Sequence, residues 1–111
     1  MYLVFDIGGT KMSMAVSSDG ETLHQTKSSP TPKDFEEGIQ TLKQAAQELA
    51  GGQKIEMVGG GIAGVLDKNK TTLIKSPHLQ DWIQKPLKET LQSSFGARVK
   101  LENDTALEGL G

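Results

Sequence analysis

The sequence predicts an α/β domain with a mixed sheet that begins with a three-strand antiparallel meander and carries flanking helices. Short β-rich runs come first, strand and helix patterns then alternate, and many of the 13 glycines are grouped between them. With 111 residues the chain has the length of one domain, long enough to bury a core. We therefore treat 1–111 as one domain.

Composition and charge exclude several classes of protein. Hydrophobic residues make up 35% of the chain, and no run approaches the roughly 18 apolar residues of a membrane span. The start, Met1 to Asp6, lacks the basic region of a secretory signal, and without cysteine there are no disulfides or thiolate sites. A net charge of −2 without clusters of one sign argues against nucleic acid. We expect a cytoplasmic protein with neither nucleic-acid nor membrane partners.

The first strands follow from composition and alternation. Residues 2–7 are β-rich and end at a glycine pair, and apolar side chains from Met12 to Val16 then occupy every second position. Ser18-Asp19-Gly20 suits a tight turn, because Asp-Gly supplies the positive φ that a hairpin needs. A third strand is expected over 21–28.

A helix is expected after the break at Ser29-Pro30. Thr31 would be its cap, Pro32 its first residue, and Asp34 would complete an arrangement close to a capping box. Apolar residues from Phe35 to Leu49 recur at helical spacing, and Gly51-Gly52 ends the pattern.

Further elements are expected in the second half of the chain: a strand over 55–58, a hairpin of 65–66 with 73–74, a helix from Pro86 to Gly96, a strand over 98–102, and the start of a helix at 106–108. Residues 59–64, mostly glycine, are expected to form a loop at the carboxyl end of the first of these strands.

The stretch Asp6-Ile7-Gly8-Gly9-Thr10-Lys11 carries the clearest chemistry. A buried strand delivers an aspartate, two glycines let a ligand approach the backbone, and a hydroxyl and an ammonium follow. Exposed amides at such a turn favour an anion, so the stretch suits nucleotide phosphates with Asp6 near a hydrated Mg²⁺. It lacks the spacing of a Walker loop. A glycine hairpin with an exposed lysine is the alternative.

Two other stretches are candidates for binding a substrate. The glycines before Asp67 would let backbone amides touch a small polar molecule, unless they form a flexible loop. Asn103 and Asp104 follow a strand, where they can bind vicinal hydroxyls, and a carboxylate there can accept the proton of an attacking hydroxyl. Either residue can instead cap a following helix.

The remaining polar and aromatic residues are expected to be structural. His24 and His78 have no serine or cysteine arrangement nearby, so solvated or hydrogen-bonded histidines are expected. Trp82 is expected to pack the second helix onto the sheet, with stacking on a sugar as the alternative. The first helix has an acidic, solvated face: Glu36, Glu37 and Glu48.

Together these pieces resemble the N-terminal lobe of the ROK sugar kinases (repressor, open reading frame, kinase), within the actin-like ATPase superfamily. The motifs that carry the resemblance are Asp6–Lys11, Gly61–Asp67, Ser76–Leu79 with Trp82, Pro86-Leu87, and Leu101–Ala106. The resemblance implies an RNase H-like lobe and an ATP-dependent hexose kinase, in which glucose, another hexose or a β-glucoside receives the γ-phosphate.

The resemblance also implies roles for residues. Gly8, Gly9, Thr10 and Lys11 would hold the ATP phosphates, and Asp6 would orient Mg²⁺ or its water. Asn103 and Asp104 would bind sugar hydroxyls, with Asp104 as general base, and the backbone of Gly64 would line the sugar site. Ala63 replaces the usual proline, and His78 stands where asparagine is common.

The resemblance further implies that the C-terminal lobe is absent here, so that this lobe alone would be inactive. A structural zinc site would belong to that missing lobe, and the full-length protein would be a homodimer that binds ATP and a small sugar. Two alternatives stay open: a sugar-sensing ROK regulator, for whose DNA-binding domain Met1 leaves no room before Asp6, or a non-catalytic sugar- or nucleotide-binding domain.

Overall fold

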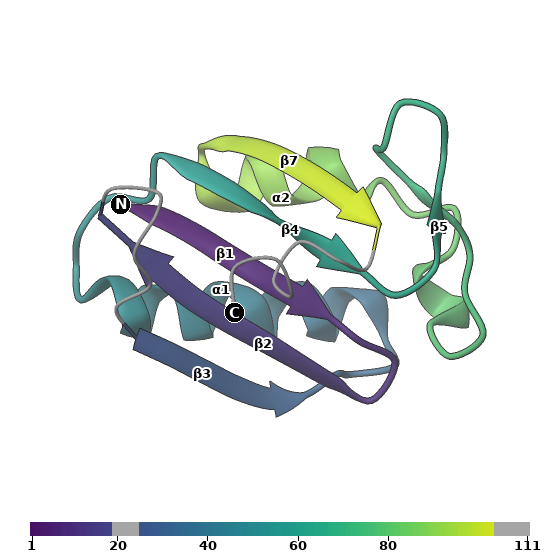
Figure 1. Ribbon diagram of the computed structural model, residues 1–111, viewed down its shortest axis with the longest axis horizontal. Coiled ribbons are helices and arrows are strands. Elements are labelled where there is room, and N and C mark those ends of the chain that lie inside the picture. Colours follow the sequence, from purple (N-terminus) through teal and green to yellow (C-terminus); the bar gives the residue numbers. More distant parts are fainter. Residues whose placement is uncertain (19–24, 104–111) are drawn as a thin grey trace.

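The computed structural model describes residues 1–18 and 25–103 (Figure 1). The elements in chain order are β1 (Tyr2–Ile7), β2 (Lys11–Ser17), β3 (Gln25–Pro30), α1 (Phe35–Ala50), β4 (Met57–Ile62), β5 (Val65–Leu66), β6 (Leu73–Lys75), the 3-10 turn η1 (Gln80–Trp82), α2 (Leu87–Phe95) and β7 (Arg98–Asn103).

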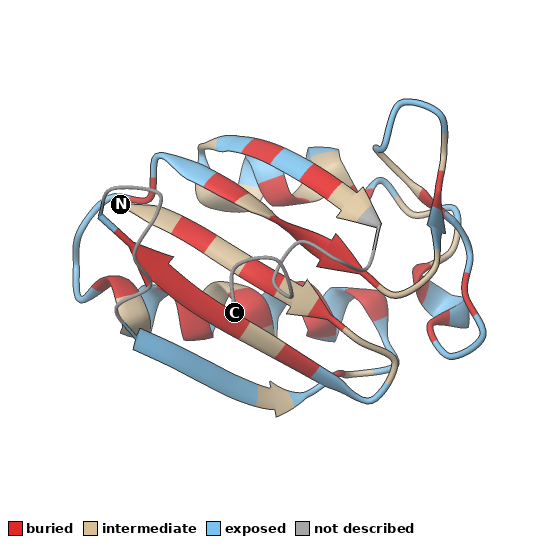
Figure 2. Ribbon diagram, in the orientation of Figure 1, coloured by how far each residue is buried: buried red, intermediate tan, exposed pale blue. Residues whose placement is uncertain are grey.

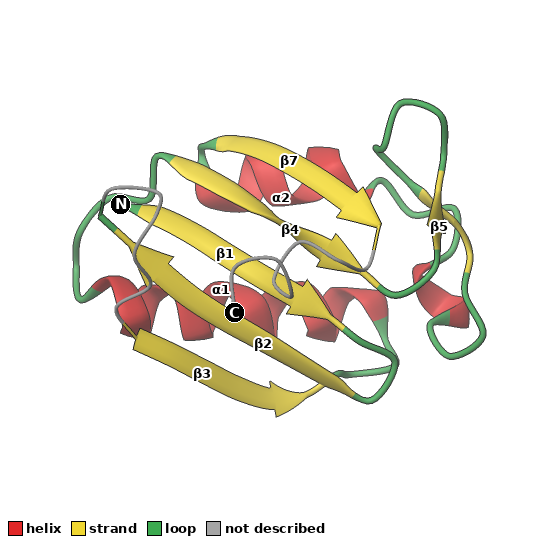
Figure 3. Cartoon of the chain, viewed as in Figure 1, coloured by secondary structure: helices red, strands yellow, loops and turns green. Residues whose placement is uncertain are grey.

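Five of the described strands form the predicted mixed sheet, in the order β3-β2-β1-β4-β7. β1, β2 and β3 pair antiparallel, which confirms the N-terminal meander, whereas β4 and β7 run parallel to β1. Both α-helices lie on one face of this sheet (Figure 3). The β5–β6 hairpin and η1 lie beyond the ends of the parallel strands, where a binding site is expected in an open α/β sheet.

The core lies between the sheet and the helices. Along β1, Leu3, Phe5 and Ile7 are buried and alternate with half-buried residues, as Figure 2 shows by the banding of the strand. Leu42 of α1 and Leu91 of α2 are fully buried against this face. The buried face of the strands, where every second residue points inward, therefore packs against the apolar faces of the two amphipathic helices.

The start of α1 differs from the prediction. Its N-cap is Asp34, whose carboxylate accepts from the amide of Glu37 at 3.0 Å. Thr31 instead continues the strand pairing, because its amide donates to the carbonyl of Thr10 at 3.0 Å. Its hydroxyl is consequently buried rather than placed at the helix end. The prediction of Thr31 as the cap was wrong, because its hydrogen bond to Thr10 holds it away from the start of the helix.

Residues 59–61 also differ from the prediction. They lie inside β4, between β1 and β7, and not in a loop. A Cβ on Gly60 would lie 2.2 Å from the carbonyl oxygen of Phe5, so glycine is needed there for close packing. Amides committed to neighbouring strands are not available to a substrate, which removes most of this glycine run from the binding site.

Several smaller expectations have clear outcomes. Gly51 and Gly96 end the two helices in the left-handed conformation, as predicted. Pro30 pairs with Lys11 in β3, which is an edge strand where proline is tolerated. Trp82 is buried in the same core cluster as Leu87 and Leu91 of α2, and it packs edge to face on Phe35 of α1, with ring centroids 5.4 Å apart.

Candidate active site

The β1–β2 turn is closed tightly by its own backbone. The amide of Gly8 donates to the carbonyl of Lys11 at 2.9 Å, and a Cβ on Gly8 would lie 2.8 Å from that oxygen. The Gly8 amide is therefore used inside the turn and does not face a ligand. Glycine is needed at residue 8 because a side chain would collide with this carbonyl, and not because of a left-handed backbone, which Gly8 does not have.

Gly9, the next residue of this turn, packs against His78. A Cβ on Gly9 would lie 2.7 Å from the Cβ of His78 and 2.8 Å from its Cδ2. Beside this contact is a hollow of about 370 Å³, lined by Gly9, Thr10, Lys33, Pro77, His78, Gln80 and Asp81. Thr10 and Lys11 are exposed, so a hydroxyl and an ammonium are accessible at the turn. We call residues 8–11 the phosphate turn, after the role that the sequence predicts for them.

The parallel strands bring the candidate residues to one edge of the sheet. Asp6 of β1 is in register with Gly61 of β4, which is in register with Glu102 of β7. In the next row, Ile7 and Ile62 align with Asn103. The phosphate turn and the end of β7 therefore leave the sheet at the same edge, on either side of β4.

Gly64 lies at this edge in a turn held from two sides. Its φ of 142° favours glycine, and a Cβ there would lie 2.3 Å from the carbonyl oxygen of Lys75. The preceding residue, Ala63, donates its amide to the carbonyl of Ile7 at 2.8 Å and accepts from the Ser76 hydroxyl at 2.9 Å. The Gly64 turn is thus tied to the end of β1.

The tip of the β5–β6 hairpin is closed by Asp67. Its carboxylate accepts from the amide of Thr71 at 2.6 Å, from the Thr71 hydroxyl at 2.8 Å and from the amide of Thr72 at 3.2 Å. These hydrogen bonds, led by the one from the Thr71 amide, hold the pKa of Asp67 below its ordinary value. Asp67 therefore has a structural role in the turn.

The hairpin is also joined to β7. The Lys70 ammonium donates to Glu102 Oε2 at 2.5 Å, and this hydrogen bond lowers the pKa of Glu102. The pair is largely exposed, so its contribution to stability is small. It nevertheless places the hairpin tip beside the residue that precedes Asn103.

The predicted residues are thus brought together where the structure describes them. Asp6, Gly64, Asn103 and the phosphate turn share one edge of the sheet. Asp104, the predicted general base, lies outside the described residues, as does His24. The predicted roles of all these residues remain predictions.

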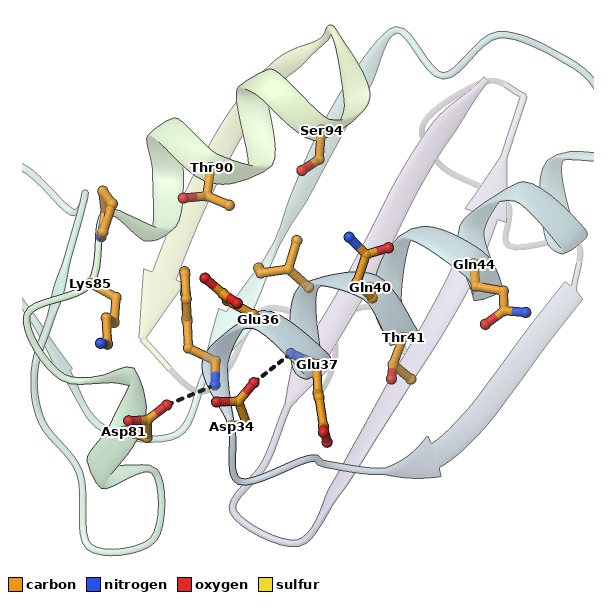
Figure 4. A pocket seen from close by; sticks show the side chains of 13 residues that line it. Asp34, Glu36, Glu37, Gln40, Thr41, Gln44, Asp81, Lys85, Thr90 and Ser94 are labelled. Atoms are coloured by element: carbon orange, nitrogen blue, oxygen red, sulfur yellow. Dashed lines mark hydrogen bonds between the residues drawn. The ribbon is translucent and has the colours of Figure 1, made fainter.

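A larger groove lies elsewhere, between α1 and α2. It has a volume of about 1190 Å³, and Figure 4 shows polar side chains of both helices around it. Asp34 and Asp81 cap the amides of Glu37 and Phe35 at the start of α1, each at 3.0 Å. The groove contains none of the predicted site residues.

Two negative findings apply to residues 1–18 and 25–103. Within these ranges the structure holds no cluster of three or more metal-ligating side chains, and no helix is long and apolar enough to cross a membrane.

Comparison with known proteins decides the family. The profile of the ROK family matches residues 2–111. The chain belongs to the ROK family. Among curated relatives, a glucokinase of Streptomyces coelicolor is 34% identical over 99 residues, which are 89% of this chain and 31% of the relative. An N-acetyl-D-glucosamine kinase of Escherichia coli is 33% identical over 108 residues, and the match covers 94% of this chain and 35% of the relative. The chain therefore spans about a third of the length of the relatives it matches.

Solved structures agree with this ROK assignment. A ROK glucokinase from Streptomyces griseus, in complex with glucose and AMPPNP, superposes with a TM-score of 0.79 at 28% identity over 93% of this chain and 33% of that one. A ROK family transcriptional regulator, a homologue of the E. coli MLC protein, superposes with a TM-score of 0.73 at 15% identity, over 94% of this chain and 28% of that one. At this identity, the likeness to the regulator shows the fold alone. The chain has the mixed α/β fold of actin-like ATPase sugar kinases.

Sequence reasoning missed three residues at this edge of the ROK fold. Ser76 bonds to Ala63, His78 packs on Gly9, and Glu102 binds Lys70. Each contact joins segments that are far apart in the chain. Local pattern gives no signal for such contacts, although Ser76 and His78 lie in a stretch that contributes to the family resemblance.

Proposed function

We propose that this chain is the N-terminal lobe of an ATP-dependent kinase that transfers the γ-phosphate to a hydroxyl of a hexose or related sugar. The observation that carries the proposal is the register of β1, β4 and β7, which aligns Ile7, Ile62 and Asn103. This register brings residues 8–11, proposed to bind phosphate, and Asn103, proposed to bind sugar hydroxyls, to one sheet edge. Phosphoryl transfer requires such proximity, because donor and acceptor must meet in line.

The phosphate turn is the proposed site for the ATP phosphates. Thr10 and Lys11 are exposed there, whereas the Gly8 amide is bonded inside the turn and Gly9 packs against His78. Lys33 and His78 line the neighbouring hollow. The exposed hydroxyl and ammonium suit an anionic group, so these side chains, and not the Gly8 amide, support the proposal.

The edge also suits a hydrated Mg²⁺. Mg²⁺ usually keeps several waters and takes one or two carboxylates, so it does not need a protein cage. Asp6 is half-buried at the end of β1 and offers one such carboxylate, which would hold the ion through its water. When bound, the ion neutralises charge on the phosphate oxygens. Asp6 would orient it, and Lys11 would add a second positive charge.

The sugar side is formed by the end of β7 and the Gly64 turn. Asn103 would donate to and accept from sugar hydroxyls, and the backbone of Gly64 would line the same pocket. Asp104 would accept the proton of the attacking sugar hydroxyl. The oxygen of that hydroxyl would bond to the γ-phosphorus while the bond from the γ-phosphorus to the bridging oxygen breaks and ADP leaves. Similarity to a glucokinase and to an N-acetyl-D-glucosamine kinase supports a hexose or an aminohexose as acceptor.

The test is turnover by the full-length protein on a panel of sugars. We expect ATP-dependent phosphorylation of at least one hexose, and we expect Asp104→Asn to lower kcat about 100-fold or more, as loss of a general base does. Glu36→Gln is the control, because it also removes a carboxylate, one that is exposed on α1 and lines the groove between the helices. It should leave kcat nearly unchanged.

Two results would contradict this proposal. If Asp104→Asn keeps more than about a tenth of the wild-type kcat, Asp104 is not the base. If no sugar on the panel is phosphorylated but one binds, the second candidate applies: a sugar-sensing regulator, which the likeness in fold to a ROK transcriptional regulator allows.

A further inference from the structure

The segment 76–79 contacts two parts of the predicted site. It follows β6 and precedes η1, beyond the ends of β1 and β4 in Figure 1. Ser76 packs on the Gly64 turn, and His78 packs on the phosphate turn. The contacts below show that it touches both.

The Ser76 hydroxyl is used fully in this segment. It donates to the carbonyl of Ala63 at 2.9 Å and accepts from the amide of Leu79 at 3.2 Å. Ser76 is 6% exposed and Leu79 is 1% exposed, so water does not replace these bonds easily. One buried hydroxyl thus joins the Gly64 turn to the start of the next segment.

The chain of contacts continues to β1. Ala63, which accepts from Ser76, also donates its amide to the carbonyl of Ile7. The Cβ of Ser76 is packed closely too, at 3.0 Å from the place where a Cβ on Gly64 would lie. The position of the Gly64 turn is therefore fixed from the sheet on one side and from Ser76 on the other.

The same segment presses on the phosphate turn. His78, two residues after Ser76, fills the space that a side chain on Gly9 would need. The Ser76–Leu79 hydrogen bond spans His78, so it constrains the backbone from which the imidazole extends. The phosphate turn and the Gly64 turn are consequently both in contact with a segment that one hydroxyl organises.

We propose that Ser76 is a positioning residue that holds the phosphate turn and the Gly64 turn at a fixed spacing. This inference rests on the proposed function, in which the first turn binds the phosphoryl donor and the second lines the sugar site. Ser76 acts through Ala63 and His78 and touches neither reactant. Its loss disturbs alignment more than binding, since small displacements of reacting groups lower the rate steeply.

The kinetic test compares three variants of the full-length protein. For Ser76→Ala we expect kcat to fall about tenfold or more, with KM for ATP and for sugar changed less than about threefold. Ser76→Thr keeps the hydroxyl and should restore kcat to within about threefold of wild type. Ser93→Ala is the matched control, because Ser93 is exposed on α2, and it should behave as wild type. A Ser76→Ala protein that stays folded with an unchanged kcat overturns the proposal.

A second measurement is independent of activity. Hydrogen exchange at the amides of Ala63 and Gly8, each hydrogen-bonded in the wild type, should accelerate in Ser76→Ala and stay unchanged in Ser93→Ala. If Ser76→Ala does not fold, Ser76→Cys, which keeps the volume with a weaker hydrogen bond, replaces it in both tests. Wild-type exchange at both amides overturns the proposal. A wild-type protein without kinase activity refutes the proposed function, and exchange then still decides the role of Ser76.

Discussion

Gly60 and Gly59 are neighbours in β4 whose substitution by alanine should have opposite outcomes. A Cβ on Gly60 would lie 2.2 Å from the carbonyl oxygen of Phe5, whereas a Cβ on Gly59 would lie 3.7 Å from that of Lys100, an ordinary contact. Gly60→Ala should therefore destabilise the protein by about 1–3 kcal/mol or more, as overpacking does. Thermal unfolding of both variants of the full-length protein measures the difference.

Gly59→Ala is the control for this prediction. Its backbone is an ordinary strand, so the variant should unfold within a few degrees of wild type, or slightly above it. Equal melting temperatures for the two variants would mean that β4 can shift away from β1, and that Gly60 is not needed for their close packing.

Residue-scale prediction from sequence depended on local chemistry. Asp6 and the phosphate turn were proposed as a site because a strand, a glycine pair and polar residues follow one another, and their roles stay predictions. The reason for the glycines was different, since Gly9 gives room to a histidine 69 positions later. Ser76 carried no local signal either, because its partner Ala63 is defined by the fold.

At the scale of elements, η1 and α1 are joined by a close contact between Trp82 and Gly38. A Cβ on Gly38 would lie 2.1 Å from Cζ2 of Trp82, so the indole takes the place of a side chain on the helix. Alanine favours a helix over glycine by about 1 kcal/mol, yet we expect Gly38→Ala to be destabilising, because overpacking costs about 1–3 kcal/mol.

A double-mutant cycle checks this prediction. Trp82→Phe removes the part of the indole that Gly38 faces, so Gly38→Ala should cost less, or should stabilise, in that background. Thermal unfolding of the four full-length proteins gives the coupling. Additive effects would show that the indole does not limit residue 38.

The β5–β6 hairpin should lose protection in acid. The pKa of Asp67 is lower in the folded hairpin than in the unfolded chain, where it has the ordinary value of 3.8. The ionised carboxylate therefore stabilises the hairpin when the pH is above this ordinary value. This contribution is lost as the pH falls through the lowered pKa. Exchange protection at Thr71 and Thr72, corrected for intrinsic rates, should therefore decrease as pH falls below the ordinary value of 3.8.

Asp67→Asn isolates the carboxylate in that experiment. Its protection at Thr71 and Thr72 should be below wild type at pH 6 and should converge with it in acid. Glu36→Gln, which removes an exposed carboxylate from α1, should follow wild type throughout. If both variants and the wild type lose the same protection at Thr71 and Thr72 as the pH falls, the loss comes from general acid unfolding and not from Asp67.

Element-scale prediction depended on periodicity. The strand from Lys11 and the two helices were found because apolar spacing repeats over several residues. β4 was shortened in the prediction because its glycines resemble a loop, and a strand paired on both sides uses glycine for packing that sequence does not display. The cap of α1 was misplaced for a similar reason, since Thr31 is drawn into strand pairing.

For the whole molecule, the arrangement of strands explains how distant motifs meet. β1 is central and pairs with β2, its neighbour in sequence, and with β4, which follows after α1. The crossover through α1 makes β4 parallel to β1, and α2 does the same for β7. Two such connections bring the ends of all three strands to one edge.

The α/β class and the meander were predictable from the sequence, but the register that aligns the strand ends required the structure.

The outer edge of the sheet at β3 has a further consequence. This strand is mostly exposed, contains Lys27, and ends at Pro30, which has no amide hydrogen to donate. Lysine and proline on an edge strand discourage another chain from adding a strand there. The lobe is therefore protected from edge-to-edge aggregation along β3, which matters most at high protein concentration and during refolding.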